Sequence, residues 1–550
     1  MSDAPERTLE PTAADEPTIT GTAAARGLTL VEMAEQLAGA LRGAGADLLY
    51  GVPGGGANLD MVGAAESAGC RFVLTHTETA AAIMAGVTAE LTGQPSALVV
   101  TRGPGAASAV NGAAQALLDR QPIVVITDCV TIADRQRVSH QRLDQGAMMG
   151  AATKASLCLG PHDTVATAAV VLALATSGRP GPVHVDVDPT APPPLSHERR
   201  RLGDAADPAA ALEAARRALR DARRPVVIVG VGALATPRHR RSATVAALRR
   251  FVSGANVPVL TTYKGRGLVA DSSGGAAGVA TGATIESAVL DGADLIVGIG
   301  LDPVELIPDP WTYPAPVVLL GSWGIDDSTF FGDRVVVEVV GDLGTILDDL
   351  TDDVSTDWES AAGAEHRQAA RRRLPGRGAG LASGPDASAG GDRGPPGRPG
   401  GHHRHRRRRG AHAGGRAAAA LVHPERHVVC FTGDGGLGMA LAELETLARL
   451  GLRVVVVVVF NDATLSLIAI KQRPEGHGGE GAVRYAPIDF AAIGTACGLA
   501  SQRVSDVAQY EQALRQALDS DGPTLLDVAV DPSAYPAVID VIRGSRRPAT

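Results

Sequence analysis

The sequence has 550 residues, of which 45% are hydrophobic and 20% charged, so it predicts a soluble globular protein with more than one core. Its formal net charge of -9 argues against a protein that binds nucleic acid or a membrane surface. The five cysteines lie far apart and form no C-x-x-C pair, which excludes a zinc finger and favours the reducing cytosol over a disulfide framework.

Neither a membrane span nor a signal peptide is expected. The longest apolar run, 454–460, is far shorter than a membrane-spanning helix requires. Residues 1–26 are rich in Thr, Ala, Pro and acids and lack an apolar central region, so they predict a disordered tail. We therefore expect a cytoplasmic protein.

Three stretches alternate short β-rich runs with helical patterns, which is typical of parallel α/β layers. The first covers 27–190, with strands expected at 48–52, 72–75, 97–101, 123–127 and 183–188 and helices at 79–91 and 107–118. The second covers 205–345, with strands expected at 225–229, 257–261, 295–300, 317–320 and 335–339. The third covers 417–540, with strands expected at 428–432, 454–460 and 524–530 and a helix at 437–450.

An anomalous segment rich in Arg, Gly, Pro and His, 360–416, separates the second stretch from the third. Between 375 and 416, Leu381 is the only Leu, Ile, Val, Met or aromatic residue. Residues 367–416 contain thirteen arginines and two acids. Such a composition cannot bury a core, so no α/β unit is expected there.

A turn of glycines follows the first strand of the third stretch. The strand at 428–432 ends in Gly433, Asp434, Gly435 and Gly436, and glycine permits a tight turn and close approach of a ligand. The all-valine strand at 454–459 ends in Phe460 and is followed by Asn461. Because a right-handed crossover brings both strand ends to one edge of the sheet, Asp434 and Asn461 should lie together.

These residues provide oxygen ligands of the kind Mg²⁺ prefers. The Asp434 carboxylate, the Asn461 amide oxygen and the Ala463 carbonyl form the predicted set, with phosphate completing the shell. A helix beginning near Thr464 would point its N-terminal amides at the same anion. The alternative is an ordinary Gly-Asp-Gly turn with Asn461 as a helix cap.

The pattern resembles the thiamine diphosphate motif of the acetolactate synthase and 2-keto-acid decarboxylase superfamily. Its second part is the Asn found 27 positions after the Asp of the Gly-Asp-Gly turn. Four runs in the first stretch resemble the pyrimidine-binding domain of that superfamily in the same order: 51–55 (GVPGG), 75–81 (THTETAA), 101–105 (TRGPG) and 121–126 (QPIVVI). The resemblance implies an α/β fold of three doubly wound parallel-sheet domains: pyrimidine-binding, central and diphosphate-binding.

The resemblance also implies roles for individual residues. Glu78 matches the catalytic glutamate that bonds to the aminopyrimidine ring of thiamine diphosphate, and Gln145 matches a residue that points at the substrate-bearing carbon. A carboxylate at Glu78 would stabilise the tautomer of the ring that accepts a proton. The implied cofactor-binding residues are Gly54, Gly103, Pro104, Gly105, Gly433, Gly435, Gly436, Leu437 and Leu465.

The implied function is decarboxylation of a small 2-keto acid with carboligation, dependent on thiamine diphosphate and Mg²⁺. Members of the superfamily place the glutamate and the metal site on different subunits, so a homodimer or homotetramer with active sites at the subunit interface is expected. The central domain holds FAD in acetolactate synthases. Residues 261–267 would line the corresponding cleft, although no motif specifies FAD.

Two departures from the superfamily leave alternatives open. Lys471 stands where acetolactate synthases carry a Trp that selects the second keto acid, so a simple 2-keto-acid or aryl-keto-acid decarboxylase is the alternative. Segment 375–416 replaces the start of the diphosphate-binding domain, and we interpret it as the product of a reading-frame disruption. A flexible linker, a metal-binding or polybasic tract, and a catalytically impaired protein with the same fold are the other readings.

Overall fold

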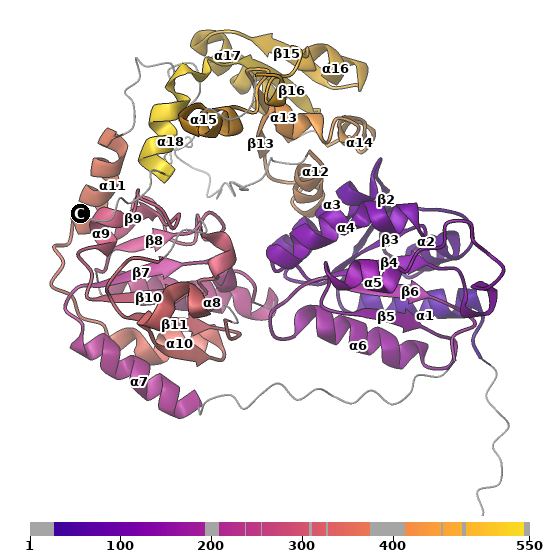
Figure 1. Cartoon of the computed structure of the whole chain (residues 1–550), viewed down its shortest axis with the longest axis horizontal. Coiled ribbons are helices and arrows are strands. Elements are labelled where there is room, and N and C mark those ends of the chain that lie inside the picture. The colour runs from indigo at the N-terminus through magenta and orange to yellow at the C-terminus, as the bar shows by residue number, and fades with distance from the viewer. Residues whose placement is uncertain are drawn as a thin grey trace, which may run out of the picture.

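Three parallel β-sheets organise the chain, as the computed structural model in Figure 1 shows. The structure describes residues 27–192, 208–236, 238–254, 256–306, 311–325, 328–373, 413–452, 455–475 and 480–543. The expected tail, 1–26, and most of the anomalous segment therefore lie outside the described residues. The sheets confirm the predicted class of three parallel-sheet α/β domains.

The first sheet has six parallel strands in the order β2-β1-β3-β4-β6-β5. They are β1 (Leu48–Val52), β2 (Arg71–Leu74), β3 (Ser96–Val100), β4 (Ile123–Asp128), β5 (Ser156–Leu159) and β6 (Val183–Val187). The sequence pattern missed β5, because this edge strand buries only its last residue. Its helices are α1 (Leu30–Gly43), α2 (Ala57–Ser67), α3 (Glu78–Thr92), α4 (Pro104–Leu118), α5 (Gln145–Gly150) and α6 (Thr164–Thr176).

The second sheet also has six parallel strands, in the order β12-β11-β10-β7-β8-β9. They are β7 (Pro225–Val229), β8 (Val259–Thr261), β9 (Ala276–Val279), β10 (Leu295–Ile299), β11 (Val317–Gly321) and β12 (Val335–Val340). The sequence analysis missed β9, another edge strand. The helices of this part are α7 (Pro208–Asp221), α8 (Arg238–Gly254), α9 (Ser287–Leu290), α10 (Leu343–Leu350) and α11 (Ala362–Arg373).

The third sheet has four parallel strands in the described chain, in the order β13-β14-β16-β15. They are β13 (Val428–Gly433), β14 (Val455–Asn461), β15 (Ala500–Val504) and β16 (Thr524–Ala529), of which only β15 was not predicted. The helices are α12 (Ala413–Val422), α13 (Asp434–Gly438), α14 (Glu443–Arg449), α15 (Ser466–Glu475), α16 (Phe490–Ala496), α17 (Val507–Leu518) and α18 (Tyr535–Arg543). The order repeats that of β3, β4, β6 and β5 in the first sheet, and counterparts of β1 and β2 do not occur among the described residues.

The prediction of a single helix at 437–450 is wrong. The chain forms the short helices α13 and α14, separated by a turn at 439–442. Glycines at 435, 436 and 438 weaken a continuous helix. The break also lets Leu437 and Leu444 both face the core while Met439, between them, is 77% exposed.

Helix α3 lies at the centre of a core shared by the first and third domains. Every residue from Ala80 to Ala89 is buried. Alanines of α4 and of α12 belong to the same hydrophobic cluster as α3, together with Leu437 and Leu444. Small residues allow these helices to approach closely: a Cβ placed on Gly112 of α4 would lie 2.5 Å from the Ala82 Cβ.

We predict opposite effects for the same Gly→Ala change at two helical positions. Gly112→Ala should lower the free energy of unfolding by about 1–3 kcal/mol, because the added methyl group overpacks the α3–α4 contact. Gly63→Ala should raise it by roughly 0.5–1 kcal/mol, since the exposed Gly63 of α2 has open space and glycine disfavours a helix. Urea unfolding of both variants measures the difference, and equal effects would contradict the close packing.

Candidate active site

Parallel pairing of β13 with β14 brings the predicted metal-binding residues to one edge of the third sheet. Gly433 pairs with Phe460, so Asp434, which follows β13, lies level with Asn461, the last residue of β14. The backbone amide of Asp462 donates a hydrogen bond to Asp434 Oδ2 at 3.2 Å. The amide of Gly435 donates to the other carboxylate oxygen, Oδ1, at 2.6 Å.

The side chain of Asn461 is held in one orientation. Its Nδ2 donates to the Ile488 carbonyl at 3.0 Å and to Asp527 Oδ1 at 3.1 Å. Its Oδ1 accepts the amide of Ala463 at 3.3 Å and so lies on the side of the loop that follows the strand. Asp527 is 1% exposed and also accepts the Phe490 amide. The sequence analysis missed this positioning role, although Asp527 is the only acid in the apolar run of β16.

The loop after Asn461 has a backbone conformation that non-glycine residues seldom adopt. Ala463 has a φ of 54°, and its carbonyl accepts the Tyr485 amide at 2.9 Å. Burial raises the pKa of Asp462, and the negative charge of the nearby Asp434 adds to this effect. Two neighbouring carboxylates, an amide oxygen and a carbonyl fit a divalent cation that prefers oxygen ligands.

Gly435 leaves little room for a side chain. A Cβ on Gly435 would lie 3.0 Å from Leu465 Cδ2. Leu465 itself is 36% exposed, whereas Leu437 is fully buried in the shared core. The structure thus places Leu465 at the surface of the site and Leu437 beneath it. No cluster of three or more His, Cys, Asp or Glu suited to a metal occurs in the described ranges.

In the first domain, Glu78 and the Gly103-Pro104-Gly105 turn lie together. Glu78 is the first residue of α3, and the Thr77 side chain caps the helix by accepting the Ala80 amide. A Cβ on Gly105 would lie 3.3 Å from Glu78 Oε1. Gly103 has a φ of 63°, and a Cβ there would lie 2.4 Å from the Gln141 carbonyl oxygen, so a glycine is required.

Gln145 is bound to the scaffold by both ends of its amide group. Its Oε1 accepts the Gly103 amide at 2.7 Å, and its Nε2 donates to Asp186 Oδ1 at 2.5 Å. The side chain is 4% exposed. This geometry suits a residue that fixes the turn beside Glu78.

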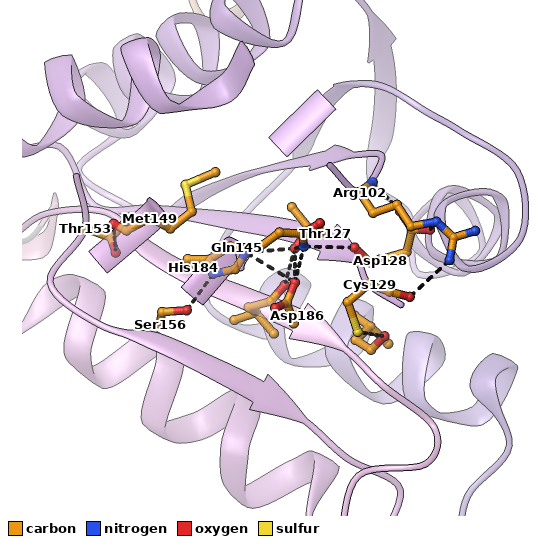
Figure 2. Close-up of polar contacts among 12 residues, drawn as sticks. Arg102, Thr127, Asp128, Cys129, Gln145, Met149, Thr153, Ser156, His184 and Asp186 are labelled. Carbon is orange, nitrogen blue, oxygen red and sulfur yellow. Dashed lines mark hydrogen bonds and ion pairs between the residues drawn. The ribbon is translucent and has the colours of Figure 1, made fainter. Parts of the chain in front are cut away.

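A buried polar network continues from Gln145 into strands β4 and β6 (Figure 2). Thr127 Oγ1 lies 2.6 Å from Asp186 Oδ1 and 2.8 Å from His184 Nε2. Burial raises the pKa of Asp186 to about 6, against the lowering effect of hydrogen bonds from Thr127 and Gln145. Burial also lowers the pKa of His184 to about 4, so the imidazole is neutral near pH 7.

Glu443 of α14 connects the third domain to the N-terminus of α3. Its Oε1 accepts the amides of His76 and Thr77 at 3.1 and 3.2 Å, directly before Glu78. The carboxylate is 1% exposed, and burial raises its pKa. The sequence analysis missed this contact, because nothing in a helical acid indicates a partner that lies 366 residues earlier.

The predicted cleft of the central domain is filled by protein. Glu305 Oε2 accepts the Val231 amide at 2.7 Å at the end of β7, and its Oε1 accepts the buried Thr262 hydroxyl at 2.7 Å. A Cβ on Gly300, after β10, would lie 2.2 Å from the Ala233 amide nitrogen. The strand ends where an α/β sheet takes a nucleotide are therefore closed by a carboxylate and by backbone, and FAD is not supported.

Segment 261–267 has a structural role instead. Lys264 Nζ lies 2.9 Å from Glu90 Oε2 and 3.3 Å from Asp119 Oδ2, so it joins the central domain to the first.

The matched protein families follow the order of the three sheets. The N-terminal thiamine pyrophosphate binding domain matches residues 31–148, the central domain of these enzymes matches 212–350, and the C-terminal thiamine pyrophosphate binding domain matches 409–528. The fold and the strand-edge site thus define a thiamine pyrophosphate (thiamine diphosphate) enzyme. The chain belongs to this family.

Similar proteins include acetolactate synthases. The acetolactate synthase of Bacillus subtilis is 26% identical over 552 residues, which cover 88% of this chain and 90% of the relative. The acetolactate synthase isozyme 2 large subunit of Escherichia coli is 28% identical, covering 90% of this chain and 94% of the relative. A probable 2-ketoarginine decarboxylase of Pseudomonas aeruginosa is 29% identical over 50% of this chain and 49% of its own length. Within the described ranges, no helix combines the length and apolar character needed to cross a membrane.

We predict that Asp186 makes the protein less stable as the pH rises from about 4 to about 6. Its folded pKa of about 6 exceeds the ordinary value of 3.8, so the folded state loses stability as the carboxyl ionises. The loss amounts to roughly 2–3 kcal/mol. His184, whose pKa is lowered to about 4, changes stability in the opposite sense over the same range, so the contribution of Asp186 is read as a difference between proteins. Unfolding by urea should show that Asp186→Asn removes this contribution and gains roughly 2–3 kcal/mol relative to wild type between pH 4 and 7. Asp519→Asn, at an exposed position in the third domain, should retain it, and parallel curves for all three proteins would contradict the assignment.

Proposed function

We propose that the protein decarboxylates a 2-keto acid and joins the resulting fragment to a second keto acid, as acetolactate synthases do. The observation that carries the proposal is the β13–β14 register, which sets Asp434 beside Asn461 at the strand edge. The likeness to acetolactate synthases over about nine tenths of the chain supports it.

Thiamine diphosphate would supply the nucleophilic carbon and accept the electrons released by decarboxylation. Asp434, Asn461 and the Ala463 carbonyl would hold Mg²⁺, and the turn at Gly433, Gly435 and Gly436 would lie against the diphosphate. Asp527 orients the Asn461 amide for this role. Oxygen ligands of this kind leave coordination positions for phosphate oxygens.

Glu78 would hold a proton at the pyrimidine ring. Gly54 and the turn of Gly103, Pro104 and Gly105 shape the surface beside it, since a Cβ on Gly54 would lie 2.4 Å from Thr101 Oγ1. Gln145 fixes that turn through the Gly103 amide.

The active unit would be a cytoplasmic homodimer or homotetramer. In it, Glu78 of one copy would meet Asp434 and Asn461 of a second copy across the subunit interface.

A simple decarboxylase is the second candidate. Lys471 of α15 takes the position at which a Trp selects the second keto acid in acetolactate synthases. The relative named as a 2-ketoarginine decarboxylase supports the same reading. Release of an aldehyde instead of acetolactate would distinguish it.

We predict that CO₂ release from pyruvate depends on Glu78. With thiamine diphosphate and Mg²⁺ present, Glu78→Gln should lower the rate by about 100-fold or more, because an amide cannot hold the proton. Glu66→Gln, an exposed helical position in the same domain, should leave it unchanged. Asp434→Asn should abolish Mg²⁺-dependent cofactor binding in calorimetry, whereas Asp352→Asn should not. Equal rates for Glu78→Gln and wild type would contradict the proposal.

We predict low turnover for the chain as printed. Segment 375–416 has a single large apolar residue, Leu381, where the family forms a wall beneath the thiamine. We expect a kcat below about 0.1 s⁻¹, whereas a typical enzyme has a kcat of about 10 s⁻¹. Rapid acetolactate formation by the purified protein would contradict this.

If the segment arose from a frame disruption, another frame of codons 375–416 should encode an apolar stretch containing Gly-Met.

A further inference from the structure

Glu443 is a buried acid beside the candidate site, and the mechanism proposed above gives it no part. It is the first residue of α14 and is 1% exposed. Burial of a carboxylate is costly unless hydrogen bonds satisfy its oxygens, so the partners of Glu443 indicate what it does in the fold.

Both carboxylate oxygens of Glu443 are hydrogen-bonded. Oε1 accepts the backbone amides of His76 and Thr77 at 3.1 and 3.2 Å. Oε2 accepts the hydroxyl of Thr446, a fully buried residue of the same helix, at 2.8 Å. Thr446 thus holds the carboxylate in the orientation in which its other oxygen faces the two amides.

The two amides belong to the turn that leads into α3. This turn runs from the end of β2 at Leu74 to Glu78, the first residue of the helix. The amides at 76 and 77 find no acceptor within α3, because helical hydrogen bonds run back toward the N-terminus and no earlier turn of the helix precedes them. Glu443 therefore fixes the path of the chain directly before Glu78.

The segment that carries Glu443 also carries the predicted metal ligand Asp434. Asp434 is the first residue of α13, the helix that precedes α14. Leu437 of α13 and Leu444 of α14 are fully buried in the core shared with α3. The chain is therefore held by packing both before and after Glu443, and the carboxylate has a fixed position from which to bind the turn.

We propose that Glu443 is a positioning residue that sets the place of Glu78. The role rests on the proposed function, in which Glu78 holds a proton at the pyrimidine ring of thiamine diphosphate. In the homodimer, the segment that begins at Asp434 of one site would thereby hold the Glu78 that serves the other site. A misplacement of about 1 Å at such a group can cost about 100-fold in rate, so a fixed turn matters for the reaction.

Hydrogen–deuterium exchange on the full chain without cofactor tests the contact. Two replacements of similar size separate hydrogen bonding from packing: Glu443→Gln keeps an oxygen that accepts the two amides, and Glu443→Leu has none. Exchange of the amides at 76 and 77 should be about tenfold faster or more in Glu443→Leu, and within about threefold of wild type in Glu443→Gln. Glu445→Gln is the matched control and should leave the exchange unchanged, because the exposed Glu445, on the same helix, contacts the imidazole of His76 and not its amide.

Calorimetry with thiamine diphosphate and Mg²⁺ tests whether the effect passes through Glu78. Glu443→Leu should weaken cofactor binding by about tenfold in the wild-type chain, but by less than about twofold in a chain that already carries Glu78→Ala. Glu443→Gln should restore most of the affinity, which a role in packing alone does not predict.

The positioning role is overturned if Glu443→Leu leaves the exchange of the two amides unchanged, or if its effect on binding adds fully to that of Glu78→Ala. If wild type binds no thiamine diphosphate, the proposed function fails, and the exchange of the two amides alone decides whether Glu443 holds the turn. Thermal unfolding verifies that each variant is folded. If Glu443→Leu does not fold, Thr446→Val takes its place, since it removes only the hydroxyl that orients the carboxylate, and it should change both measurements several-fold in the same direction.

Discussion

All three domains meet on helix α3. Its middle is buried among the first sheet, α4 and α12, with no polar face left for water. At its N-terminus the Glu443 carboxylate of the third domain accepts the amides of residues 76 and 77. At its C-terminus Arg241 of the central domain donates to carbonyls of the last turn. An acid at the N-terminus and a cation at the C-terminus both complement the helix dipole.

This arrangement determines where Glu78 lies. It is the first residue of a 15-residue helix whose middle, residues 80–89, is buried in the shared core, so its position is tied to that core. Such a helix is about 22 Å long and rigid, so its two ends are positioned together. The Gly103–Gly105 turn is fixed independently, by Gln145 and the buried Asp186. Glu78 and the turn are therefore brought together by two separate sets of contacts.

The sequence predicted the strands that can be recognised from the composition of a short run of residues. The apolar runs of β4, β7 and β10 are buried on both faces and were recognisable by composition, as was the valine run of β14. Strands β5 and β15 were not recognised, because they mix polar and apolar residues. Strand β9 was not recognised, because it has only four residues, three of them Ala or Gly. Asp434 and Asn461 were found from their places after strands. Glu443, Asp527 and Asp186 were not found, because each acts through a partner far away in the chain, which local patterns do not reveal.

The part of the candidate site that would hold metal and diphosphate depends on different segments of the chain from the part that would support the thiamine. The carboxyl edge formed by β13 and β14 needs only those two strands and β16, and their register is complete in the described chain. The first sheet, whose last four strands have the same order, carries two further strands beside the equivalent of β13. In the third domain the described residues directly before β13 belong to α12, which contributes Ala417, Ala418, Ala419 and Ala420 to the core. The geometry that would hold a metal ion and diphosphate is therefore independent of the region that would support the rest of the cofactor.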